Sequence, residues 1–136
     1  MKVYVSARAK TRLSEVREIH AELKTMGFTI TSDWVDQEIK KPYRDPRNRV
    51  YNTKLQEDML RSAAKTDIFI MLDEPGLRGA YVELGAFLTD CLGDSKNRKA
   101  YIVGPMSHER EFIFESPDYV VFADDVNSVY EALKLL

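Results

Sequence analysis

The segment Asp67-Ile68-Phe69-Ile70-Met71-Leu72 constrains the fold of this chain more than any other. Five of its six side chains are apolar, which is typical of a strand that is buried on both faces. Such a strand lies in the middle of a parallel sheet, because the crossover helices of parallel sheets cover both faces. We therefore expect the rest of the chain to supply flanking strands and crossover helices.

The remaining pattern alternates strands with helices. We expect further strands at 2–6, 28–31, 99–104 and 119–122, and helices at 11–26, 51–63, 80–92 and 125–136. Thr11 and Asp124 or Asp125 are the expected N-caps, Gly27 the expected stop, and 32–50 a long loop. This predicts one domain over 1–136: an α/β, doubly wound (flavodoxin-like or Rossmann-like) five-stranded parallel sheet, strand order 2-1-3-4-5, with helices on both faces.

The composition argues against a metal-binding protein and against a membrane protein. The chain has 136 residues, one cysteine and two histidines, without zinc-ligand spacing, so we expect no metal and no cofactor. No apolar run approaches membrane-spanning length, and the start reads as a strand, so we expect a cytoplasmic protein with no membrane partner. Acid–base or nucleophilic chemistry then falls to carboxylates and tyrosines.

Charge is unevenly distributed. The formal net charge of −2 gives no case for binding nucleic acid. Residues 1–50 nevertheless hold 11 Lys and Arg against 7 Asp and Glu. This basic first third could meet a phosphate, or it could be a solvated surface.

Ligands of doubly wound folds bind beyond the carboxyl ends of the strands, at the switch point. That location selects Ser6–Arg12 and Asp73–Glu83. Neither contains G-x-G-x-x-G or G-x-x-x-x-G-K-[ST], which excludes a dinucleotide site and a P-loop. The segment after the first strand also lacks the acidic cluster of a phosphoacceptor domain.

Glu83 is the unusual residue of the second segment. It stands in Gly79-Ala80-Tyr81-Val82-Glu83-Leu84-Gly85-Ala86, in the first turn of the expected helix. A helix N-terminus stabilises a carboxylate, which makes Glu83 either a nucleophile or electrostatic partner of a developing cation, or an acid that only complements the helix dipole.

Three further residues have two interpretations each. Asp58 is a solvated helix acid or a substrate contact, and Tyr4 is a core residue or a catalytic one. Trp34 either stacks on a base or anchors the long loop to the core.

Four segments together resemble the nucleoside 2-deoxyribosyltransferase family and its relatives, the 2′-deoxynucleoside 5′-monophosphate N-glycosidases. They are Val3–Ser6, Glu57–Leu60, Thr66–Ile70 and Gly79–Ala86. The last is similar to the family's G-x-x-x-E-L-G-x-A element. The resemblance covers residues 2–104, and the tail matches only in its strand and helix pattern.

The resemblance implies a cleavage of the N-glycosidic bond of a (2′-deoxy)nucleoside. Glu83 would be the nucleophile and Tyr4 would position it. Asp58 would contact the substrate near the broken bond, as leaving-group acid or as ligand of sugar hydroxyls, and Asp73 would bind the sugar. The sugar then passes to another free nucleobase in a transferase, or to water in a hydrolase of nucleoside 5′-monophosphates. A non-catalytic nucleotide-binding module is the third alternative.

The remaining expected substrate contacts lie near the strand ends. They are Ser6, Arg8, Lys10 and Gly79, and Ser107 after the fourth strand. The first loop lacks the family's glycines, but its basic residues near a helix N-terminus suit a phosphate. A pocket completed by a neighbouring subunit predicts a homo-oligomer with shared active sites.

Overall fold

The structure is a computed structural model that describes residues 1–104, 114 and 117–136. In chain order its elements are β1 (Lys2–Ser6), α1 (Leu13–Thr25), β2 (Thr29–Ile30), the 3₁₀ turn η1 (Trp34–Asp36), α2 (Pro46–Lys65), β3 (Ile68–Leu72), α3 (Gly79–Cys91), β4 (Lys99–Val103), β5 (Val120–Ala123) and α4 (Val126–Lys134). No helix in this part of the chain is both long enough and apolar enough to cross a bilayer.

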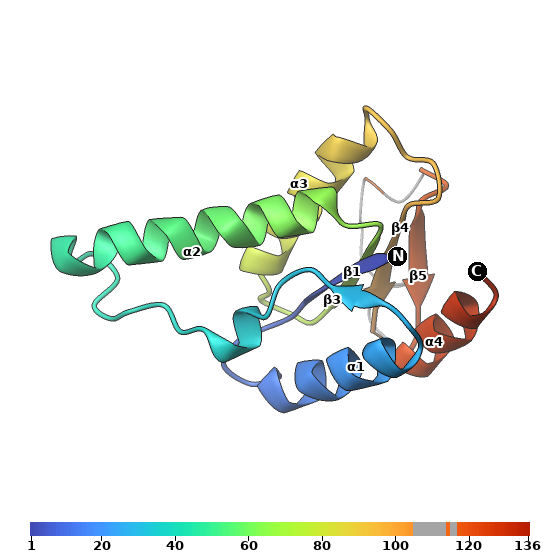
Figure 1. The fold of residues 1–136 in the computed structure, drawn as a ribbon, viewed down its shortest axis with the longest axis horizontal. Helices are drawn as coiled ribbons and strands as arrows, with labels where there is room; N and C mark the ends of the chain where they lie inside the picture. Colours follow the sequence, from blue (N-terminus) through green and yellow to red (C-terminus); the bar gives the residue numbers. More distant parts are fainter. Residues whose placement is uncertain (105–113, 115–116) are drawn as a thin grey trace.

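The five strands form one parallel sheet in the order β2-β1-β3-β4-β5. Helices α1 and α4 cover one face and α2 and α3 the other (Figure 1). The predicted α/β doubly wound fold and its strand order are therefore confirmed. The chain order reverses direction between β1 and β3, and this switch point brings the loops after those two strands together.

The core is centred on β3, whose five residues are all buried. Three aromatic rings from different elements stack through it: Tyr4 on Phe69 and Phe69 on Phe87, each pair with centroids 5.6 Å apart. The stack ties β1, β3 and α3 together, and those are the elements that carry the candidate site.

Two helix starts differ from the sequence expectation. Helix α2 begins at Pro46, because the Asp45 side chain accepts a hydrogen bond from the Arg47 amide and Pro46 fits the first helical position. The expected long loop is therefore shorter and also contains η1. Helix α1 has Arg12 and not Thr11 at its N-cap, and the Arg12 guanidinium contacts both oxygens of Glu15.

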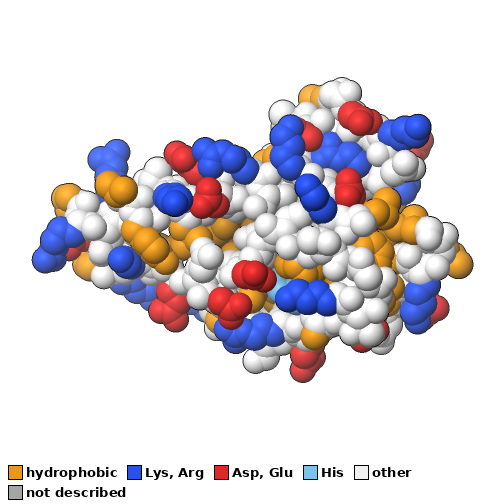
Figure 2. Space-filling model, in the orientation of Figure 1, with side chains coloured by type: hydrophobic (Ala, Val, Ile, Leu, Met, Phe, Trp, Pro, Cys, Tyr) orange, Lys and Arg blue, Asp and Glu red, His pale blue; other side chains and the backbone are white. Residues whose placement is uncertain are grey.

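The basic excess of residues 1–50 gathers at one end of the molecule. The amino-terminal half of α2 and the loop before it extend away from the sheet (Figure 1). Figure 2 shows Lys and Arg side chains spread over this end. The buried Asn52 side chain fastens that loop to α2, accepting from the Lys40 amide at 2.8 Å and donating to the Lys40 carbonyl at 2.9 Å. Most of the predicted basic surface thus lies outside the switch point.

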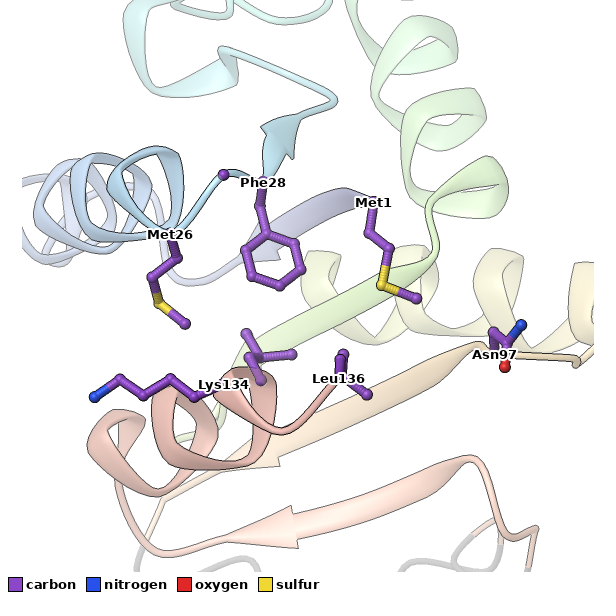
Figure 3. Close-up of a pocket in the computed structure, with 8 residues that line it drawn as sticks. Met1, Met26, Phe28, Asn97, Lys134 and Leu136 are labelled. Atoms are coloured by element: carbon purple, nitrogen blue, oxygen red, sulfur yellow. The ribbon is translucent and has the colours of Figure 1, made fainter.

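A cavity of about 600 Å³ lies at the opposite, amino-terminal edge of the sheet (Figure 3). Its walls include Met1, Met26, Phe28 and Leu133, with the Lys134 side chain at one side. Among the described residues, no acidic side chain lines it, and Lys134 is the charged one. This cavity therefore does not offer the carboxylate that the sequence predicts for the active site.

Candidate active site

A second cavity, of about 300 Å³, lies between the loops that follow β1 and β3. The residues that line it are Ala7, Arg8, Ala9, Trp34, Met59, Gly76, Leu77, Arg78, Gly79, Ala80 and Glu83. Most of these residues belong to Ser6–Arg12 and Asp73–Glu83, the two segments that the sheet topology selects in the sequence. Both loops and the first turn of α3 therefore converge on one hollow, as expected for the switch point of this fold.

Glu83 is the only acidic side chain among the described residues that line this cavity. The Tyr4 hydroxyl donates a hydrogen bond to Glu83 Oε2, and the Ser6 hydroxyl donates one to Oε1 at 3.2 Å. Burial raises the pKa of Glu83 to about 7, although both hydrogen bonds oppose that rise. The carboxylate is thus oriented through both oxygens and titrates near neutral pH.

Tyr4 contacts both the hydrophobic core and Glu83. Its ring is fully buried against Phe69, and its hydroxyl reaches Glu83. Burial raises the pKa of Tyr4 above its ordinary range, and the charge of Glu83 adds to that effect. The phenol therefore stays protonated and keeps donating. Tyr4 is thus a core residue, as one interpretation has it, and its contact with Glu83 is compatible with the catalytic role, which stays a prediction.

Trp34 anchors the loop as one interpretation predicts, while stacking on a base stays a prediction. Its indole N–H donates to the Val5 carbonyl at 2.7 Å, so the residue anchors η1 to β1. The same side chain forms part of the cavity wall. An anchored ring of this kind presents a fixed apolar surface to a ligand.

Asp58 is not brought to the cavity. It lies on the exposed side of α2, where its carboxylate accepts from Arg61 at 3.2 Å, and more than half of its side chain is accessible to solvent. Its neighbour Met59 lines the cavity instead. A substrate contact by Asp58 remains a prediction that requires the side chain to leave Arg61.

Asp73 lies at the end of β3, outside the cavity lining. It is buried and accepts a hydrogen bond from the Tyr81 hydroxyl at 2.9 Å. Its amide donates to the Val103 carbonyl at 2.7 Å. Gly104 packs closely here, since a Cβ at that position would come within 3.0 Å of the Asp73 carbonyl oxygen. Asp73 therefore joins β3, β4 and α3 beside the site.

The basic residues of the first loop have different surroundings. Arg8 lines the cavity, Lys10 is exposed and lies outside the lining, and Arg12 pairs with Glu15. Arg78 also lines the cavity, from the position just before α3. Arg78 was not among the residues predicted from the sequence, although an arginine directly before the start of a helix that follows a central strand is a signal for an anion site.

Gly79 begins α3 and lines the cavity as predicted for a substrate contact, and Ser6 contacts Glu83. Ser107 lies outside the described residues. Among the described residues, no three His, Cys, Asp or Glu side chains come together as they would around a metal ion. Chemically, the cavity offers one carboxylate with two hydroxyl donors, two arginines and an apolar wall.

No protein-family model matches the chain, and no curated protein matches its sequence. Among solved structures, the CMP N-glycosidase BcmB of Clostridium botulinum superposes with a TM-score of 0.60, with 14% identical residues and with 100% of both chains covered. The two chains therefore share a fold over their whole length.

Proposed function

We propose that this protein cleaves the N-glycosidic bond of a nucleoside 5′-monophosphate, with Glu83 as the nucleophile. The observation that carries the proposal is the Glu83 carboxylate at the cavity, fixed by Tyr4 and Ser6 through its two oxygens. Supporting it is the fold shared with a CMP N-glycosidase.

In the first chemical step a Glu83 oxygen attacks the anomeric carbon. The bond from that carbon to the base nitrogen breaks, and its electron pair leaves with the base, which takes up a proton. The transition state resembles an oxocarbenium ion, so the carboxylate stabilises it by charge as well as by bond formation. A glycosyl ester of Glu83 results. Water then attacks the anomeric carbon from the side opposite Glu83, the bond from that carbon to the Glu83 oxygen breaks, and the carboxylate is regenerated while the water gives up a proton. The two inversions give net retention.

The arginines suit the phosphate of such a substrate. Arg8 and Arg78 enter the cavity from opposite loops, and the first turn of α3 adds its positive dipole end. Guanidinium groups bind phosphate through paired hydrogen bonds. Trp34, Met59 and Leu77 provide the apolar wall, which suits the base.

The remaining predicted contacts are part of the proposal. Asp58 protonates the departing base or binds sugar hydroxyls, and Asp73 acts on the sugar side. A homo-oligomer completes each cavity with a polar residue from the segment after β4 of the neighbouring subunit, for which Ser107, His108 and Glu109 are the candidates in the sequence. The protein is expected to act in the cytoplasm.

A second candidate is transfer of the sugar to another nucleobase. The favouring observation is that the described cavity lining holds no carboxylate besides Glu83 that could activate water. A free nucleobase can attack the same glycosyl ester through its own nitrogen, without a carboxylate that activates water.

The test incubates the protein with cytidine, CMP and their 2′-deoxy forms, with and without a free acceptor base, and follows the products by chromatography. Loss of base from the monophosphates alone supports the hydrolase. Appearance of a new nucleoside supports the transferase instead. Glu83→Gln abolishes either activity, while the matched control Glu57→Gln, on the exposed side of α2, retains it. Nucleotide binding without any cleavage would mean that the site is a binding module.

A further inference from the structure

Arg8 contacts two residues of the opposite loop. Its Nη2 donates to the Pro75 carbonyl at 3.0 Å, and its Nε lies 3.5 Å from Oε1 of Glu74. Residues 6–12 follow β1 and residues 73–78 follow β3, so this contact joins the two loops that enclose the cavity. One of the two guanidinium groups that line the cavity is therefore held by the opposite loop.

The contact is built into the second loop. Gly76 has a φ of +80°, and a Cβ at this position would lie 3.0 Å from Arg8 Nη2. Glycine thus satisfies two conditions there: it adopts the left-handed conformation that turns the loop, and it leaves room for the guanidinium. A side chain at position 76 would displace Arg8 from this place.

The pairing is nevertheless incomplete. Arg8 Nε and Glu74 Oε1 are both buried atoms with no hydrogen-bond partner among the described residues. Buried polar atoms normally have a partner, so this donor and this acceptor are costly to leave as they are. A ligand oxygen that took the Arg8 Nε–H would satisfy the donor, but an anionic oxygen would be repelled by Glu74.

We propose that Glu74 determines how strongly the cavity binds a phosphate, because it competes with the phosphate for Arg8. A carboxylate and a phosphate use the same paired donors of a guanidinium, so only one of them can hold Arg8 fully. The side chains of Arg8 and Glu74 are 38% and 28% exposed, so solvent weakens their attraction and a phosphate can displace Glu74. When phosphate binds, Arg8 exchanges its contact with Glu74 in the loop 73–78 for a contact with the phosphate. Arg78, which has no such contact with Glu74 to give up, is the second cation for the phosphate.

This inference rests on the proposed function for its biological meaning, but its test does not depend on turnover. Binding of inorganic phosphate is measured by calorimetry at constant ionic strength for the wild type, Glu74→Gln and Glu57→Gln. Glu57 is also paired with an arginine, 3.3 Å away on α2, so its variant controls for the loss of one surface charge. Glu74→Gln should bind phosphate about three- to fivefold more tightly, the scale expected for a partly exposed ion pair, and Glu57→Gln should match the wild type.

A double variant decides whether the effect passes through Arg8. In an Arg8→Met background, Glu74→Gln should no longer change phosphate affinity. An equal gain in that background would show a general charge effect and overturn the proposal, as would unchanged or weaker binding by Glu74→Gln, or no phosphate binding by either protein.

The same samples are assayed for cleavage of CMP and cytidine. If the wild type cleaves neither, the proposed function fails while the binding comparison still tests the role of Glu74. If it cleaves both, Glu74→Gln should raise the ratio of kcat/KM for CMP to that for cytidine by a similar factor.

Discussion

The Tyr4 hydroxyl donates a hydrogen bond to Glu83 across 79 residues of sequence, from the middle of a buried strand to α3. Glu83 lies just beyond the first turn of this helix, and not in that turn as the sequence predicted, because α3 already begins at Gly79. The phenol cannot readily ionise in its buried place, so it acts as a permanent donor. This contact fixes where the carboxylate lies, and the expected effects of changing it are specific.

Tyr4→Phe should lower kcat/KM by about 10- to 100-fold, because the nucleophile loses one of its two orienting donors. The Tyr4 hydrogen bond lowers the pKa of Glu83, so its removal should raise that pKa further. The acidic limb of the pH–rate profile should therefore move to higher pH. A rate loss with an unmoved profile would contradict this role.

The cleavage rate should depend on pH through Glu83 itself. Its pKa of about 7 predicts that kcat/KM falls as pH decreases below neutral, since only the ionised carboxylate attacks. A profile that stays flat from pH 5 to 8 would exclude Glu83 as the titrating nucleophile.

Stability should show the opposite dependence. The pKa of Glu83 rises from 4.5 to about 7 on folding, so between these values the folded state binds more protons than the unfolded state. The free energy of unfolding therefore falls with rising pH through this window, by at most about 3 kcal/mol. In urea titrations at pH 5 and pH 8, Glu83→Gln should lose most of this dependence and be more stable than the wild type at pH 8.

Gly76 and Gly85 form a matched pair for backbone effects. Gly76→Ala should destabilise the protein by about 1–2 kcal/mol, because its positive φ disfavours any side chain. Gly85→Ala, within α3 and with nothing within 4 Å of its Cβ position, should stabilise it by about 0.5–1 kcal/mol. Thermal unfolding of both variants checks the two signs, and two equal shifts would contradict the assignment.

Arg98 should be the most sensitive position outside the cavity. Its buried guanidinium donates to the carbonyls of Ala64, Thr66 and Asp94 and to the carboxylate of Asp90. Arg98→Ala leaves these acceptors without their donor, and we expect a loss of about 3–5 kcal/mol. Arg98→Lys should recover only part of the lost stability, because an ammonium group cannot reproduce the planar set of N–H donors of a guanidinium. Chemical denaturation of the two variants measures both effects.

The sequence was sufficient for the sheet order and for the place of Glu83 at the cavity. The first follows from an apolar central strand among alternating helices, and the second from a carboxylate among small residues near a helix start. It was insufficient for Asp58. The resemblance places that residue near the substrate, but helical geometry turns the adjacent Met59 toward the cavity and pairs Asp58 with Arg61 one turn on.

The roles of the arginines depend on loop geometry that periodicity does not encode. Arg8 reads as a free phosphate ligand in the sequence, and only the turn at Gly76 brings Pro75 and Glu74 within its reach. Likewise, the high charge of residues 32–50 predicted a loop, although Asp45 and Pro46 form a helix-capping signal within it, and α2 begins there.

Helix α3 is fastened at both ends. Glu83, near its start, accepts hydrogen bonds from two residues of β1, and Asp90, in its last turn, is held by Arg98 next to β4. The Glu83 carboxylate is thereby positioned by the sheet, while the loop 73–78 contributes arginine, glutamate and glycine beside it. If Glu83 is the nucleophile that we propose, substitutions in that loop would change which molecule is admitted without moving it. New substrate preferences could then evolve while the bond-breaking step is preserved.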